Sequence, residues 1–139
     1  MRHPWRMKQV VFDLGGARNA MKTRPPIYTK YYDLLNWILD KTGKFPKNIR
    51  FSLVQKVDNI AIDILEDIIE ALYRRDREAM HQSVNIKFEK LRIFLRLCHD
   101  RGLLSGDQLR FAVGEIDEIG RMWHGWTGRK DDEKSGKSI

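Results

Sequence analysis

The chain has 139 residues, of which 42% are hydrophobic and 32% charged, with a single cysteine, Cys98. This length suffices for one domain with a buried core, and a lone cysteine excludes an internal disulfide and fits a reducing compartment. No apolar run approaches the roughly 18–20 residues of a membrane span, so we expect no membrane helix. The apolar run 10–12 is short and ends at Asp13, so we expect no secretory signal. We therefore expect a cytoplasmic protein.

The net charge of +7 belongs mainly to the ends of the chain. Residues 1–24 carry six cations and one acid, whereas residues 25–128 carry 16 cations and 15 acids. Nucleic-acid binding by the body of the protein would therefore depend on how its charges are segregated rather than on their sum.

The first 24 residues show no sustained hydrophobic period, and Pro25 and Pro26 separate them from the rest of the chain. We interpret residues 1–24 either as a basic flexible arm or as a non-native extension before a start at Met21. The final segment, 128–139, is poor in apolar residues, which is typical of a disordered tail. The folded domain should span residues 25–127.

Hydrophobic spacing of three and four predicts four helices between these ends. The first covers roughly 27–42 and should end at Gly43, and the second should run as one long regular helix over roughly 46–74, with Pro46 at its start. Their apolar lines are Tyr28, Tyr31, Leu35, Ile38 and Leu39, then Ile49, Leu53, Val57, Ile60, Ile64, Ile68, Ala71 and Leu72.

The third predicted helix covers roughly 77–100, with Asp76 as its N-cap and Gly102 as its stop. Ser105 and Gln108 form an S-x-x-Q capping box for the fourth, roughly 106–124. Its apolar line is Leu109, Ala112, Val113, Ile116, Ile119, Trp123 and Trp126. Short connections make neighbouring helices antiparallel, so we predict an all-α fold, an up-down-up-down four-helix bundle.

The third helix has more apolar residues than one bundle can bury. At about 100° per residue, Val84, Phe88, Leu91, Phe94, Leu95 and Cys98 share the core sector. A second apolar sector, which we call the seam, contains Ile86, Ile93 and Leu97 at coiled-coil spacing. The seam predicts an oligomer interface, although scattered exposed aliphatic residues are the alternative.

No pattern predicts catalysis. Glu78 and His81 have the spacing of one di-iron ligand pair, but a di-iron bundle needs a second pair and two more glutamates. Cys98 and His99 point about 100° apart on a helix, and Trp123 and Trp126 are expected to close the end of the bundle rather than to stack on bases. We expect no enzymatic activity, no metal site and no cofactor.

Charges in the body are segregated along the sequence. Residues 41–56 contain five cations and no acid, whereas residues 58–70 contain five acids and no cation. These blocks either pair with each other across neighbouring helices or leave a basic surface for phosphate backbones.

Several consecutive segments resemble the Avd family, the accessory variability determinants of diversity-generating retroelements. The segments are YTKYYDLLNWILDKTGKFPK, FPKNIRFSLVQKVDNIAIDILEDIIEALYRRDRE, NIKFEKLRIFLRLCHDRGLLS and GEIDEIGRMWHGW, which together cover about residues 25–127 in order. The broader superfamily includes four-helix-bundle proteins encoded in intervening sequences of ribosomal RNA genes.

This resemblance implies a four-helix bundle that assembles into a barrel-shaped homopentamer, binds RNA or DNA through a basic surface, and associates with the retroelement reverse transcriptase. Such a protein supports mutagenic reverse transcription of template-repeat RNA and performs no chemistry itself. Residues 1–24 depart from the family pattern, which begins near RPPIYTKYYDLL. In a ring, a few cations per subunit would form a belt. The candidates are Lys44, Lys47, Arg50, Lys56, Arg74, Arg75, Arg77, Arg92 and Arg96.

Arg92 and Arg96 could instead form ion pairs between subunits, with Glu89 nearby. Two other functions stay open at this point: an intervening-sequence bundle protein of unclear role, and a structural helical bundle without a nucleic-acid partner.

Overall fold

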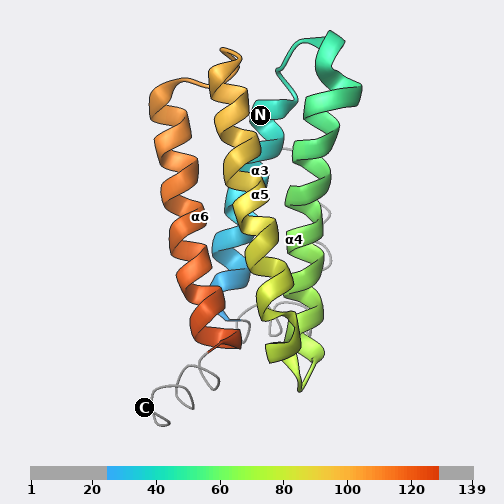
Figure 1. The fold of residues 1–139 in the computed structure, drawn as a ribbon, viewed down its shortest axis with the longest axis vertical. Helices are drawn as coiled ribbons and strands as arrows, with labels where there is room; N and C mark the ends of the chain where they lie inside the picture. The colour runs from blue at the N-terminus through green and yellow to red at the C-terminus, as the bar shows by residue number, and fades with distance from the viewer. Residues whose placement is uncertain (1–24, 129–139) are drawn as a thin grey trace, which may run out of the picture.

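The computed structural model describes residues 25–128, and all the regular structure within them is helical. Each of the four long helices packs against two neighbours, and successive helices run in opposite directions (Figure 1). This arrangement confirms the predicted four-helix bundle. In the described part of the chain, no helix has both the length and the apolar character needed to cross a bilayer. The helices are α3 (Pro26–Thr42), α4 (Gln55–Tyr73), α5 (His81–Asp100) and α6 (Gly106–Thr127). The arm predicted for residues 1–24 lies outside the described residues, and so does the tail predicted for 128–139 except for Gly128, which is the buried C-cap of α6.

The predicted helix ends are largely confirmed because their signals are local. Gly43 is the C-cap of α3, and its N–H donates to the carbonyl oxygen of Leu39 over 3.0 Å. Gly102 ends α5 with a φ of 78°, a left-handed conformation in which glycine has no Cβ penalty. Ser105 and Gln108 form both hydrogen bonds of the capping box that opens α6.

The prediction of one regular helix over 46–74 is wrong in its first two turns. Residues Lys47–Ile49 form a 3-10 turn, η1, and Arg50–Val54 form a π-helical turn, η2, before α4 begins. The wider π turn changes which side chain reaches the core: Val54 is buried, whereas Leu53 is only partly buried.

The start of the third predicted helix also differs from expectation. Residues Arg77–Met80 form a 3-10 turn, η3, and the α-helical part begins at His81. Asp76 stands at the N-cap position but makes no side-chain cap. Its carboxylate instead accepts two hydrogen bonds from the guanidinium of Arg74, each 2.9 Å long.

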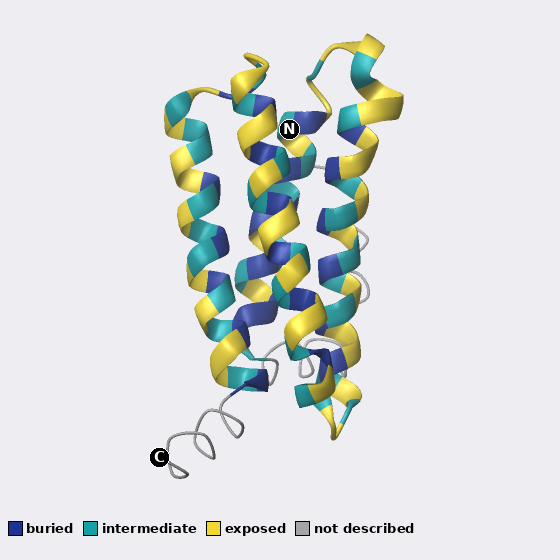
Figure 2. Cartoon of the chain, viewed as in Figure 1, coloured by how far each residue is buried: buried dark blue, intermediate teal, exposed yellow. Residues whose placement is uncertain are grey.

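The core lies along the axis of the bundle, and exposed residues cover the outward faces (Figure 2). Tyr31 is fully buried and donates from its hydroxyl to the carbonyl oxygen of Ala61 over 2.6 Å. Burial raises the pKa of this phenol, so it remains protonated as a donor. Phe94 was predicted to be core but is only partly buried, because it lies at the border between α5 and α4. The predicted core residues of α5 that are buried are Val84, Phe88, Leu91, Leu95 and Cys98.

Candidate nucleic-acid interface

α4 begins and α5 ends at the same end of the bundle (Figure 1). Five exposed cations lie at this end. Within residues 25–128, none of them has a carboxylate within ion-pair distance. An unpaired exposed cation is available to a phosphate without first losing a partner. We call this set the basic rim: Lys44, Lys47, Arg50, Lys56 and Arg101.

The local backbone explains why the rim points to solvent. Pro46 directly precedes η1, and the 3-10 and π turns then lead into α4 without adding a regular amphipathic face. Only Val54 is buried in these two turns, so Lys47 and Arg50 stay exposed. Departures from α-helical geometry of this kind occur frequently at functional sites.

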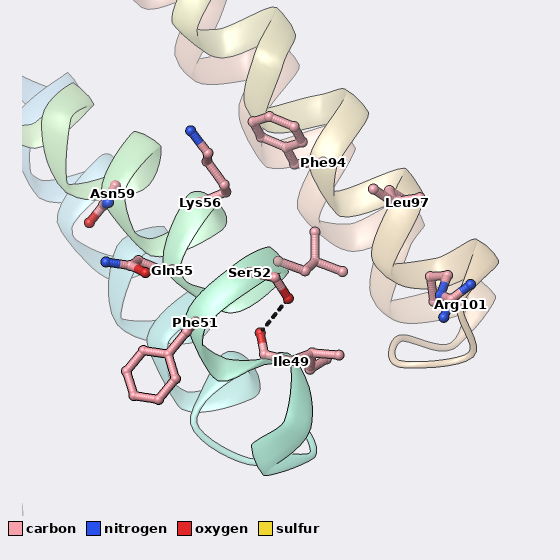
Figure 3. Close-up of a pocket in the computed structure, with 10 residues that line it drawn as sticks. Ile49, Phe51, Ser52, Gln55, Lys56, Asn59, Phe94, Leu97 and Arg101 are labelled. Carbon is pink, nitrogen blue, oxygen red and sulfur yellow. Dashed lines mark hydrogen bonds between the residues drawn. The ribbon is translucent and has the colours of Figure 1, made fainter.

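A hollow of about 780 Å³ adjoins the rim between the start of α4 and the end of α5. Phe94, Leu97 and Arg101 form the α5 side, and Lys56 and Ser52 lie on the opposite side (Figure 3). The lining is thus mostly apolar, with one cation on each side. The other lining residues are Ile49, Phe51, Leu53, Gln55 and Asn59.

The arginines of the α4–α5 connection lie at the opposite end of the bundle. The 19 residues of α4 separate them from the rim by about 28 Å at 1.5 Å per residue. Arg74 pairs with Glu70 over 2.7 Å and with Asp76 over 2.9 Å, and these acids raise the pKa of its guanidinium. Arg75 is exposed and has no ion pair among the described residues. The structure therefore does not bring these predicted residues together with the rim.

Arg77 has a packing role at that end. Its guanidinium lies 4.6 Å from the ring centre of Trp126, a cation–π contact. Trp126 packs edge-on against the buried Trp123, whose indole N–H donates to the carbonyl oxygen of His81. These contacts place both tryptophans in the closure of the bundle end, as predicted.

Arg92 and Arg96 differ in their surroundings. The Arg92 side chain bridges to α6, where its Nε donates to Asp117 over 2.8 Å, and it lies 3.9 Å from Glu89. Arg96 is exposed and lies 4.0 Å from Asp100. Both arginines thus have acidic partners within the subunit, and Arg96 is the more exposed of the two.

The seam residues are exposed, as the sequence predicts. Ile86, Ile93 and Leu97 retain 47%, 58% and 42% of their accessible surface. They lie on the outside of α5, opposite its buried residues, with the exposed Glu89 and Lys90 between Ile86 and Ile93. Leu97 also lines the hollow, so the seam and the hollow share a border.

No group of three His, Cys, Asp or Glu residues within 25–128 is placed to hold a metal ion. Burial raises the pKa of the Cys98 thiol to about 11, which disfavours the reactive thiolate.

Comparison with known families adds an independent observation. A family model described as bAvd-like matches residues 27–130, which is more than half of the 139-residue chain. The chain belongs to the bAvd-like family. This result confirms the resemblance to Avd proteins. Searches of curated proteins and of solved structures give no match.

Two residues of this bAvd-like chain were missed as candidates from the sequence. Phe51 departs from the apolar spacing of Ile49 and Leu53 and directly follows a cation. These two features of the sequence could have identified it as a candidate. Arg101 precedes the helix-ending Gly102 and gives no comparable local signal, because only the folding of α5 against α4 brings it to the rim.

Proposed function

We propose that this protein is a non-enzymatic accessory protein of a diversity-generating retroelement. It binds nucleic acid and the retroelement reverse transcriptase, and thereby supports mutagenic reverse transcription of template-repeat RNA in the cytoplasm. Membership of the bAvd-like family supports the retroelement role. The observation that carries the nucleic-acid role is the basic rim of exposed cations without ion-pair partners among residues 25–128.

The rim suits phosphate binding without sequence recognition. Its cations lie along the irregular turns before α4 and at the end of α5. Two of them, Lys56 and Arg101, lie on opposite sides of the hollow. A nucleic-acid backbone gains affinity at such a site chiefly by release of counterions, so binding should weaken steeply with salt.

The seam supports assembly of the protein into a homopentameric ring. Ile86, Ile93 and Leu97 leave about half of their accessible surface uncovered in the subunit. Burial of apolar area stabilises association at about 25 cal/mol per Å². In a ring each rim is repeated by symmetry. Several weak contacts to one nucleic-acid strand then act together and raise the overall affinity.

The rim is tested by a salt titration of RNA binding, measured by fluorescence anisotropy. Lys47→Gln/Arg50→Gln should lower affinity and flatten the dependence on salt, because two phosphate contacts are lost. The matched control is Arg74→Gln/Arg75→Gln, which removes the same charge at the opposite end of the bundle and should change binding little. Equal losses in both variants would contradict a localised site. If only deletion of residues 1–24 abolishes binding, the rim is not the site.

The seam is tested by light scattering. Ile93→Glu or Leu97→Glu should dissociate the ring and leave the helical circular dichroism signal intact, because both side chains are exposed in the subunit. The control is Thr29→Glu, which adds the same charge at an exposed position of α3, on another helix than the seam. A wild-type protein that is monomeric at micromolar concentration would contradict the oligomer.

Association with the reverse transcriptase is tested by co-purification of the two proteins from a strain that carries both genes. Recovery of the enzyme with the wild type and with Arg74→Gln/Arg75→Gln is expected. No recovery under low-salt conditions would contradict the proposed partner.

A further inference from the structure

Phe51 is an unusual residue for a soluble bundle. It retains 85% of its accessible surface, more than any other large hydrophobic side chain that is exposed within residues 25–128. The neighbouring cores of α3 and α4 do not use it, because it belongs to the π turn η2 and projects outward (Figure 3). Packing within the subunit therefore does not explain why a phenylalanine side chain stands at position 51.

The surroundings of Phe51 are cationic. Arg50 precedes it, Lys47 lies in the adjoining η1 turn, and Lys56 and Arg101 border the hollow that Phe51 also lines. A partner of this surface has to supply negative charge and a planar apolar face together. An unpaired nucleotide supplies both, since its base is free to stack, whereas a duplex keeps its bases within the helix.

The hollow extends the surface on which a strand could lie. Figure 3 shows Phe51 on the side of η2 away from α5, next to Gln55, while Phe94 and Leu97 lie across the hollow on α5. Its volume of about 780 Å³ is comparable to typical small-molecule pockets of about 300–1,000 Å³. The exposed amide side chains of Gln55 and Asn59 line it and can donate to or accept from base edges.

We propose that this end of the bundle binds single-stranded nucleic acid, with Phe51 stacked on an unpaired base and Lys56 and Arg101 on the flanking phosphates. This inference rests on the proposed nucleic-acid binding and specifies its ligand. The strand crosses from the ring of Phe51 over η2 into the hollow. Binding is sequence-tolerant, because every base has a face on which an aromatic ring can stack.

The test compares a single-stranded oligouridylate with an RNA duplex of the same length by fluorescence anisotropy. Phe51→Ala should weaken binding of the single strand about tenfold or more, the loss expected for a base stack, and leave duplex binding unchanged. The dependence on salt should keep its slope, since Phe51 releases no counterion. Phe51→Trp should retain affinity, and its additional fluorescence should be quenched when the strand binds.

The matched control is Tyr73→Ala. Tyr73 is 78% exposed and lies at the other end of α4, where the adjacent Arg74 is already paired with Glu70 and Asp76. This variant should bind both RNAs as the wild type does. Equal loss for Tyr73→Ala and Phe51→Ala would overturn a specific stacking role.

Three other results overturn the inference in distinguishable ways. If light scattering shows that Phe51→Ala dissociates the ring, a second copy of the chain is the occupant of this surface. If the wild type binds both RNAs with a steep salt dependence and Phe51→Ala binds like it, the stacking is wrong while the proposed function stands. Binding to neither RNA refutes both.

Discussion

Two glycines, one within α6 and one at its C-cap, provide a matched test of how tightly the end of the bundle is packed. A Cβ at Gly128 would lie 2.6 Å from Cε1 of His81 and 3.0 Å from each ring nitrogen, whereas a Cβ at Gly114 would meet nothing within 4 Å. Gly128→Ala should therefore force the imidazole to move, and Gly114→Ala should not.

The His81 ring cannot move without losing hydrogen bonds. The Thr127 hydroxyl donates to the carbonyl oxygen of Trp123 over 2.7 Å, so its oxygen accepts from Nδ1–H of His81 over 2.8 Å. The amide nitrogen of Asn85 donates to Nε2 over 3.1 Å. Both ring nitrogens are thus used, and this assigns the neutral Nδ1–H tautomer.

These contacts set the expected magnitudes. Overpacking at Gly128 should cost about 1–3 kcal/mol of unfolding free energy, and Gly114→Ala should gain up to about 1 kcal/mol because alanine favours the helix. For a domain of this size, 1 kcal/mol shifts Tm by about 4–8 °C. The two variants should therefore shift Tm in opposite directions in thermal denaturation at equal protein concentration. If Gly128→Ala raises Tm as Gly114→Ala does, the His81 cluster is not rigid and our account of this end is wrong.

Buried ionisable groups give two more predictions. Burial raises the pKa of Asp58 above its ordinary 3.8, partly opposed by the hydroxyl of Thr42, so the native state binds a proton more tightly and unfolding free energy falls as pH rises between the two pKa values. Asp58→Asn should accordingly raise Tm at pH 7 and make Tm less dependent on pH. A lower Tm in this variant, with Thr42 unchanged, would contradict the prediction. Because the pKa of Cys98 is raised to about 11 and the residue is buried, its thiol should react with a disulfide reagent far more slowly in native protein than in urea, and equal rates would contradict this.

The sequence predicted those parts of the fold that depend on residues close together in the chain. The ends at Gly102 and Ser105 follow from single residues and a four-residue box, and the seam follows from helical spacing alone. The turns η1 and η2 were missed, because over stretches of three and five residues an apolar spacing of three or four does not distinguish α-helical from 3-10 or π geometry. The choice depends on which side chain, Leu53 or Val54, the other helices accept into the core.

The candidate cations show the same distinction between contacts that can be predicted from residues close together in the chain and contacts that form only when helices pack. The Arg74–Glu70 pair is four residues apart on α4 and could be read from spacing, whereas Arg92 and Asp117 are 25 residues apart and meet only when α5 and α6 pack. Sequence alone therefore gave nine candidate cations, of which it set apart only Arg92 and Arg96 as possible ion-pair formers. The structure separates four exposed cations of this set at one end of the bundle from four arginines with acidic or aromatic partners in the subunit, and leaves Arg75 exposed at the opposite end.

The nearly neutral body of the chain does not argue against binding at the rim, because electrostatic interactions in salt solution are local. The Debye length is about 8 Å at physiological ionic strength. Asp67 and Glu70 lie 12 and 15 residues along α4 from Gln55, or about 18 and 22 Å, so most of their effect on a phosphate at the rim is screened. Asp58 is nearer, but its carboxylate is half-buried against Thr42, and Asp100 lies beside Arg101 yet faces Arg96. A phosphate at the rim thus meets five cations without ion pairs among residues 25–128. Two other exposed acids stand at the same end of the bundle, Asp40 of α3 and Asp107 of α6, and Asp107 is paired with Arg110.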